Sequence, residues 1–289
     1  KRHQALMAGL SRSIAPSRPH SPSRLSASVQ PLSISLPVAH RSNPLALRLW
    51  KPSLPRGDRL WIALMPGLGG SPNHLQWLAR YVATAGWPVV LLEHPGSDAA
   101  AVQALLDGRE SFDGARALQQ RQRDLDAVLQ AQAQQRLPLP GDRVVLLGHS
   151  MGALTALVAA GHRPQSGMER RCRQALADLP LTNLSRLLQC ELVERGALRS
   201  RSRMVIPAAV VGLNSLGSLI WPGQPSITQP NPLLLIGGTL DLVTPPLDEQ
   251  IGLLAALGQH PVSRVVVIEG PSHFSPIRVG ESAVRSRDD

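Results

Sequence analysis

The sequence has few aromatic residues and almost no cysteine. Its 289 residues include two phenylalanines, one tyrosine and five tryptophans, so the core of a folded domain must be mainly aliphatic. No apolar run reaches the roughly 20 residues that a membrane-spanning helix needs. The only cysteines, Cys172 and Cys190, lack a Cys-x-x-Cys spacing, so we expect neither a metal site nor a disulfide framework. These absences predict a soluble cytoplasmic protein with no integral membrane contact.

Acidic residues are missing from the first 57 positions, which carry nine Lys and Arg side chains. This stretch holds most of the net charge of +10, and the remaining chain is close to neutral. It also lacks the interleaved aromatics that stack on bases, so no nucleic-acid partner is expected. Residues 1–30, rich in Ser, Pro and Arg, predict a disordered tail. Their composition also resembles a transit peptide, and docking to an anionic surface is an alternative. Residues 281–289 are a second, polar tail.

Cofactor-binding patterns are absent as well. Gly67-Leu68-Gly69-Gly70 has neither the glycine spacing of a dinucleotide loop nor the Lys-Ser/Thr of a phosphate loop. Glu93 and His94 have no partners at metal-ligand spacing and are expected to stabilise a loop or to lie at the rim of the pocket. We therefore expect no cofactor and no metal.

The chain does contain a Gly-x-Ser-x-Gly pentapeptide, residues 148–152, between the apolar run 144–147 and the helix-like stretch 153–160. This order predicts a sharp strand-to-helix turn that exposes Ser150 as a nucleophile. Gly148 and Gly152 would avoid a collision where the chain doubles back. His149 is expected to point away from Ser150 and to support the turn.

An acid and a histidine follow the serine in the order that such a turn requires. The predicted strand 232–236 leads to Asp241, and the predicted strand 263–268 leads to His273. Because parallel strands bring their carboxyl ends to one edge of the sheet, Ser150, Asp241 and His273 can converge there. Asp98, which precedes the serine, and Asp178, which does not follow a strand, are weaker candidates for the acid.

The turn also needs backbone donors for a developing oxyanion. One is expected from Met151, directly after the nucleophile, and the other from Leu68, in the glycine-rich loop that follows the strand 61–65. After this loop, Ser71 and Pro72 predict an N-cap and a first-turn proline for a helix over 74–85.

Strands and helices alternate along most of the chain. Residues 32–50, together with 59–65, predict an antiparallel leading edge. The expected parallel part comprises strands at 88–93, 144–147, 208–213, 232–236 and 263–268, with helices at 114–134 and 151–161. This pattern predicts one α/β domain over residues 31–280.

Residues 163–203 interrupt this alternation and are expected to form a small helical cap. Six leucines recur there at helical spacing: Leu179, Leu181, Leu184, Leu187, Leu188 and Leu192. Either the cap lines an acyl pocket or it simply packs on the domain, and the spacing does not decide between them.

These motifs together resemble the α/β-hydrolase superfamily over residues 45–277. The residues 65–70, 92–97, 148–152 and 237–241 are similar to those of bacterial, especially cyanobacterial, dienelactone-hydrolase-like and platelet-activating-factor-acetylhydrolase-like proteins. Pro66-Gly67 stands where many relatives have His-Gly, and Ser150 where true dienelactone hydrolases have cysteine. The resemblance implies the α/β-hydrolase fold and an Asp241, His273 and Ser150 triad.

The expected activity is hydrolysis of a carboxylic ester or thioester, with a small-molecule or lipid-like substrate. An acyltransferase or lipid-modifying enzyme with the same triad is one alternative. A non-catalytic binding protein on the same scaffold is another. The oligomeric state is not predicted.

Overall fold

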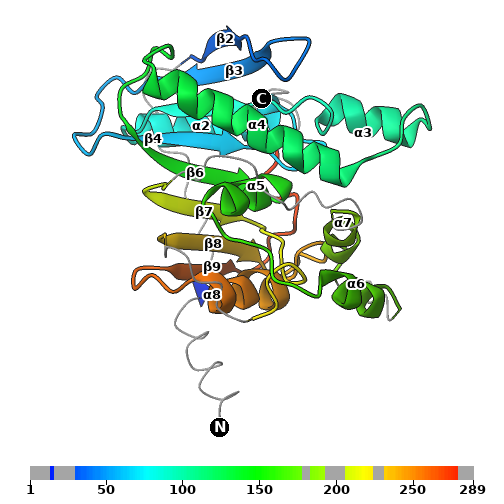
Figure 1. Cartoon of the computed structure of the whole chain (residues 1–289). Coiled ribbons are helices and arrows are strands. Elements are labelled where there is room, and N and C mark those ends of the chain that lie inside the picture. Colours follow the sequence, from blue (N-terminus) through cyan, green and yellow to red (C-terminus); the bar gives the residue numbers. More distant parts are fainter. Residues whose placement is uncertain (1–13, 16–29, 178–182, 193–205, 224–230, 279–289) are drawn as a thin grey trace, which may run out of the picture.

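The computed structural model describes residues 14–15, 30–177, 183–192, 206–223 and 231–278. They form a mixed, mostly parallel β-sheet with helices on both faces (Figure 1). The strands, in chain order, are β1 (Ile14–Ala15), β2 (Leu32–Leu36), β3 (Leu45–Trp50), β4 (Leu60–Met65), β5 (Val89–Leu92), β6 (Arg143–His149), β7 (Ala209–Leu213), β8 (Leu233–Gly238) and β9 (Arg264–Ile268).

The strand order is β1-β9-β8-β7-β6-β4-β5-β3-β2. Strands β2 and β3 pair antiparallel, as do β3 and β5, and the other neighbours are parallel. The expectation that residues 59–65 belong to the antiparallel edge is therefore wrong. Five of the six residues of β4 are buried, and a strand covered on both faces lies in the interior of a parallel sheet.

The helices are α2 (Pro72–Thr84), α3 (Ala99–Leu106), α4 (Gly114–Ala133), α5 (Met151–Ala159), α6 (Met168–Ala177), α7 (Ser185–Glu191), the π-helical turn η1 (Pro246–Ile251) and α8 (Gly252–Leu257). Helices α4, α5 and α8 pack on one face of the sheet, and α2 packs on the other (Figure 1). The sequence analysis predicted neither α3 nor the η1–α8 segment.

The start of α2 follows the sequence signals closely. Ser71 is the N-cap, its hydroxyl accepts a hydrogen bond from Asn73 N–H at 3.1 Å, and Pro72 occupies the first turn. Because the helix begins here, the preceding glycine-rich loop is held between β4 and α2. The predicted N-cap is confirmed.

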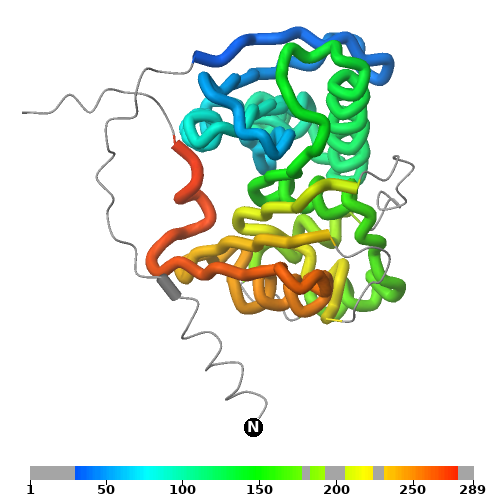
Figure 2. The backbone as a smooth tube through the Cα atoms, turned by 90° about the vertical axis from the view of Figure 1, so that its left-hand side faces the viewer, coloured from blue at the N-terminus to red at the C-terminus, as the bar shows by residue number. Residues whose placement is uncertain are grey.

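Two residues of the predicted N-terminal tail form β1, which pairs in parallel with β9 at the sheet edge. Residues 1–13 and 16–29, and all of 281–289, lie outside the described residues, so both tails stay predictions. At the other end of the described chain, residues 269–278 run along the side of the sheet opposite α4 (red and green in Figure 2).

Helices α6 and α7 occupy the region of the predicted cap. Leu184 and Leu187 are 39% and 47% exposed, whereas Leu188 packs against the core and Leu192 is buried. The described leucines therefore do not share one apolar face. Leu179 and Leu181 lie outside the described residues.

A buried carboxylate holds α7 against the domain. Glu249 of η1 is fully buried and accepts hydrogen bonds from the side chains of Ser185 (3.0 Å) and Gln189 (2.9 Å) on α7. It also accepts from the backbone N–H groups of Gly217 (2.7 Å) and Ser218 (2.9 Å). Buried oxygens are tolerated only when they accept hydrogen bonds, so these donors join three segments at one point.

The two cysteines form a disulfide between α6 and α7, with Cα atoms 5.5 Å apart. The expectation that the two cysteines form no disulfide is therefore wrong. The separation of 18 residues carries no pairing signal, because it is the packing of α6 against α7 that brings Cys172 and Cys190 together. The disulfide also removes the argument from cysteine for a reducing compartment.

Within the described part of the chain, no helix combines the length and the apolar character needed to cross a membrane.

Candidate active site

Ser150 lies in the sharp turn between β6 and α5. Its backbone has φ 52° and ψ −119°, which is rare for a residue with a side chain and is a strained conformation found at functional sites. A Cβ on Gly148 would overlap the backbone of Gly152, and a Cβ on Gly152 would overlap the carbonyl oxygen of Met65. Only glycine fits at both positions, so the turn places Ser150 at the carboxyl end of β6.

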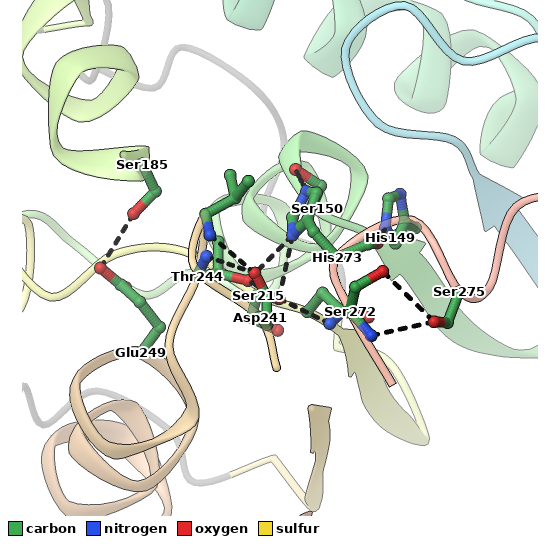
Figure 3. Close-up of polar contacts among 12 residues, drawn as sticks. His149, Ser150, Ser185, Ser215, Asp241, Thr244, Glu249, Ser272, His273 and Ser275 are labelled. Atoms are coloured by element: carbon green, nitrogen blue, oxygen red, sulfur yellow. Dashed lines mark hydrogen bonds and ion pairs between the residues drawn. The ribbon is translucent and has the colours of Figure 1, made fainter. Parts of the chain in front are cut away.

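Ser150, His273 and Asp241 form a hydrogen-bonded row (Figure 3). The Ser150 Oγ lies 3.0 Å from His273 Nε2, and His273 Nδ1 lies 3.0 Å from Asp241 Oδ2. All three residues are buried, with exposed fractions of 7% for Ser150, 5% for His273 and 1% for Asp241. The acid and the histidine follow the neighbouring strands β8 and β9, which is why residues far apart in the sequence meet here.

The carboxylate of Asp241 is enclosed by donors. Its Oδ1 accepts from the N–H groups of Val243 (2.9 Å) and Thr244 (2.7 Å). Its Oδ2 accepts from Asn214 Nδ2 and Thr244 Oγ1, each at 2.6 Å, besides the contact with His273. Burial by itself would raise the pKa of Asp241, but the hydrogen bonds from His273 and Thr244 outweigh burial and hold that pKa well below its ordinary value. Asp241 is therefore ionised at neutral pH.

Thr244 and Asn214 were missed by the sequence analysis. Thr244 follows the acid by three residues, the spacing at which a side-chain carboxylate caps the next turn. Asn214 directly follows β7 and has φ 49°, so it stands at the same sheet edge as the acid. A polar residue at the end of the strand next to the acid strand was a usable signal.

The two expected backbone donors belong to the residue directly after Ser150 and to the loop after β4. Met151 is the first residue of α5, where a helix leaves its N–H groups without internal partners. Leu68 lies in the loop after β4, and a Cβ on its neighbour Gly67 would approach Ser150 Cβ at 3.1 Å. Among the described residues, neither Leu68 N–H nor Met151 N–H donates to another residue.

His149 points away from the Ser150 hydroxyl, as expected, but it supports the histidine loop. Its Nε2 lies 2.9 Å from the carbonyl oxygen of His273, and the two rings are 5.0 Å apart. Burial lowers the pKa of His149 to about 4, so at neutral pH the ring is uncharged and Nε2–H can donate to this carbonyl.

The weaker candidates lie elsewhere. Asp98 caps α3, accepting from Ala101 N–H at 2.9 Å, and Asp178 lies outside the described residues. His94 is buried and bonds to Asp124 at 2.9 Å, which is the expected structural role. In the described part of the chain, no three His, Cys, Asp or Glu side chains gather in a group that could hold a metal.

The sheet order, the turn at Ser150 and the row of three side chains define the α/β-hydrolase fold. Among solved structures, the chain is similar to a dienelactone hydrolase from Anabaena variabilis, with 22% identity, a TM-score of 0.50, and coverage of 85% of this chain and 89% of that one. It is also similar to the thermophilic esterase Est2 from Thermogutta terrifontis, with 15% identity, a TM-score of 0.53, and coverage of 89% and 86%. Identities this low establish the fold alone, and at that level the expected resemblance is confirmed.

Residues 58–170 match the family described as serine aminopeptidase S33. The match spans less than half of the chain. It includes Ser150 but ends before Asp241 and His273, so the roles of those two residues depend on geometry. Among curated proteins, no sequence matches this chain.

Proposed function

We propose that this protein is a serine hydrolase that cleaves a carboxylic ester or thioester through an acyl-enzyme. The observation that carries the proposal is the row from Ser150 Oγ through the His273 ring to the Asp241 carboxylate. The match of residues 58–170 to a serine peptidase family and the α/β-hydrolase fold support it. The substrate is a small molecule whose acyl group reaches Ser150.

In the first half of the reaction, Ser150 Oγ attacks the acyl carbonyl carbon while His273 Nε2 accepts the hydroxyl proton. Asp241 orients the ring through Nδ1–H and stabilises the imidazolium that forms. The carbonyl oxygen becomes an oxyanion, which accepts from Leu68 N–H and Met151 N–H. The tetrahedral intermediate then expels the alcohol or thiol, which takes the proton from His273.

In the second half, water attacks the acyl-enzyme and gives a proton to His273 Nε2. A second oxyanion forms in the same position and collapses, breaking the bond between the acyl carbon and Ser150 Oγ. His273 returns the proton to Ser150, and the carboxylic acid leaves.

Fluorophosphonate labelling with intact-mass detection tests the proposal. The wild-type protein should gain one adduct, and Ser150→Ala should gain none and lose about 10⁴-fold or more in turnover of p-nitrophenyl esters. Ser275→Ala, a change of an exposed serine on the histidine loop, is the matched control and should label like the wild type.

If the wild-type protein takes no adduct and hydrolyses no ester, the binding-protein alternative replaces this proposal. An added acceptor alcohol separates hydrolysis from acyl transfer, because an acyltransferase would form the new ester in preference to the acid.

The location in the cell stays a prediction. The disulfide between Cys172 and Cys190 favours an oxidising compartment over the reducing cytoplasm that the sequence analysis predicts. Cell fractionation would decide between the two.

A further inference from the structure

A buried arginine forms hydrogen bonds with the loop that carries Leu68. Arg121 of α4 is 1% exposed, and its guanidinium donates from Nη1 to the carbonyl oxygen of Pro66 at 2.7 Å. Its Nη2 donates to the carbonyl oxygen of Gly67 at 2.8 Å, and its Nε donates to Ser97 Oγ at 2.8 Å. Burial lowers the pKa of Arg121 to about 9, and the charge of Asp124 opposes this, so the side chain stays protonated at neutral pH.

These hydrogen bonds, together with the one from Gly70 N–H to the Gly67 carbonyl oxygen at 3.1 Å, set which way the N–H groups of the loop point. The described chain has no cis peptide bond, and in a trans peptide the C=O and the following N–H lie on opposite sides. Because the Gly67 carbonyl faces Arg121, the Leu68 N–H faces away from Arg121. A rotation of this peptide by 180° would remove the Leu68 donor and would cost Arg121 Nη2 its hydrogen bond to the Gly67 carbonyl oxygen.

The far end of the loop depends on the same arginine through Ser97. Gly69 N–H donates to the Ser97 carbonyl oxygen at 2.9 Å, and Ser97 Oγ is also within 3.2 Å of the His94 carbonyl oxygen. Arg121 therefore holds residues on both sides of Leu68, directly at Gly67 and indirectly at Gly69.

Helix α4 is itself anchored one turn further on. Asp124 is fully buried and accepts from Arg41 Nε at 2.6 Å and Nη2 at 2.7 Å. Its oxygens also lie 2.7 Å from His40 Nε2 and 2.9 Å from His94 Nδ1. This cluster ties α4 to the loops after β2 and β5, so Arg121 acts from a rigid base.

We propose that Arg121 is a positioning residue that orients the Gly67–Leu68 peptide so that Leu68 N–H faces the oxyanion formed at Ser150. This inference rests on the proposed hydrolase function. The fork of a guanidinium can bind two adjacent carbonyl oxygens at once, which the single ammonium of lysine cannot do with the same geometry.

Arg121→Lys tests the proposal, with Arg171→Lys as the matched control. Arg171 also donates to three backbone carbonyl oxygens, those of Leu219 (2.6 Å), Ser166 (2.6 Å) and Gln165 (3.0 Å), but on α6. Both changes remove backbone anchoring, and only Arg121 anchors the oxyanion loop. We expect Arg121→Lys to lower kcat about 100-fold with little change in KM, as loss of one oxyanion donor does, and Arg171→Lys to leave both near wild type.

A ¹³C-labelled trifluoromethyl ketone reports the oxyanion directly. Ser150 would add to the ketone carbon, and the ¹³C shift of the hemiketal changes when its oxygen ionises. In Arg121→Lys the pKa of that oxygen should rise by one unit or more, and in Arg171→Lys it should not move. A loss of stability alone would not shift this pKa. An unchanged pKa with kcat within threefold of the wild type would overturn the proposal.

Two further experiments cover the cases in which Arg121→Lys does not fold or the wild-type protein is not a hydrolase. If Arg121→Lys does not fold, Ser97→Ala removes the Nε contact, together with the hydrogen bond from the Ser97 hydroxyl to the His94 carbonyl oxygen, and should raise the same pKa by a smaller amount; no rise there would count against the proposal. If the wild-type protein takes no fluorophosphonate, the proposed function fails instead. The crystal structure of an Arg121 variant then decides, because an unrotated Gly67–Leu68 peptide would refute the positioning role.

Discussion

Replacing Asp241 by Asn removes the charge at the end of the row formed by Ser150, His273 and Asp241 while keeping the size of the side chain. The carboxylate accepts at both oxygens, so the amide cannot satisfy all of its neighbours. If the Asn oxygen faces the N–H groups of Val243 and Thr244, its NH₂ faces Asn214 Nδ2, Thr244 Oγ1 and His273 Nδ1.

This substitution changes which ring nitrogen of His273 carries the proton. An NH₂ group opposite Nδ1 makes that nitrogen the acceptor, so the ring proton moves to Nε2. A protonated Nε2 cannot take the proton of Ser150 Oγ, which lies 3.0 Å away. The equivalent change in a serine protease lowers kcat by about 10⁴-fold, which corresponds to about 5.4 kcal/mol of transition-state stabilisation.

The expected loss of stability is much smaller. At least one buried donor, such as the Asn214 amide, loses its acceptor, which costs about 1–3 kcal/mol of unfolding free energy. A loss of this size leaves the variant folded under assay conditions if the domain has an ordinary stability of about 5–15 kcal/mol. The effect of the substitution on kcat can therefore be measured separately from its effect on the unfolding free energy.

Initial rates with a p-nitrophenyl ester, divided by the concentration of folded protein from circular dichroism, measure the effect. Asp248→Asn is the matched control, because Asp248 is a partly exposed acid in η1 that contacts Asn183 and Arg186. It should change kcat by no more than about twofold. A folded Asp241→Asn protein with more than a tenth of the wild-type kcat would refute the role given to Asp241.

Two further predictions concern the fold. Denatured protein that has not been reduced should show no free thiol, and two reactive thiols at this stage would refute the disulfide. Reduction of the Cys172–Cys190 bond should lower the unfolding free energy by about 3 kcal/mol, as expected for a loop of this length. Burial lowers the pKa of His162 to about 4 from its ordinary value near 6.5, so an unfolded chain binds the proton first as pH falls. The contribution of His162 to the unfolding free energy is therefore fully present above pH 6.5, and it should fall by about 1.4 kcal/mol per pH unit down to pH 4. Urea unfolding of the wild type and His162→Phe from pH 7 to 4 checks this, and equal slopes would contradict it.

Local patterns in the sequence were enough for most of the parallel strands and for the start of α2. The turn at Ser150 was also predictable, because its two glycines and the apolar segments beside it are contiguous in the chain. Asp241 and His273 could be placed at the same edge since each directly follows a predicted strand. The short helix α3 and the η1–α8 segment carry weaker periodicity and were missed.

The role of Arg121 could not be predicted from the local sequence pattern. Arg121 lies on the buried side of α4 together with Leu118, Leu125 and Val128, so a charged residue in an apolar position was visible in the sequence. Its partners were not, because they are backbone carbonyls of a loop that only the packed sheet brings to α4. Asn214 is similar, since its role depends on β7 lying next to β8.

The sequence by itself determined where the chain turns, which stretches are strands and helices, and which residue types follow the strands, because sterics and hydrophobic periodicity act between near neighbours in the chain. Only the tertiary structure decided that β4 lies inside the parallel sheet, that Cys172 and Cys190 bond, and that Asn214 and Arg121 lie beside the site. Those contacts join segments distant in sequence, and their existence depends on how all the elements pack at once.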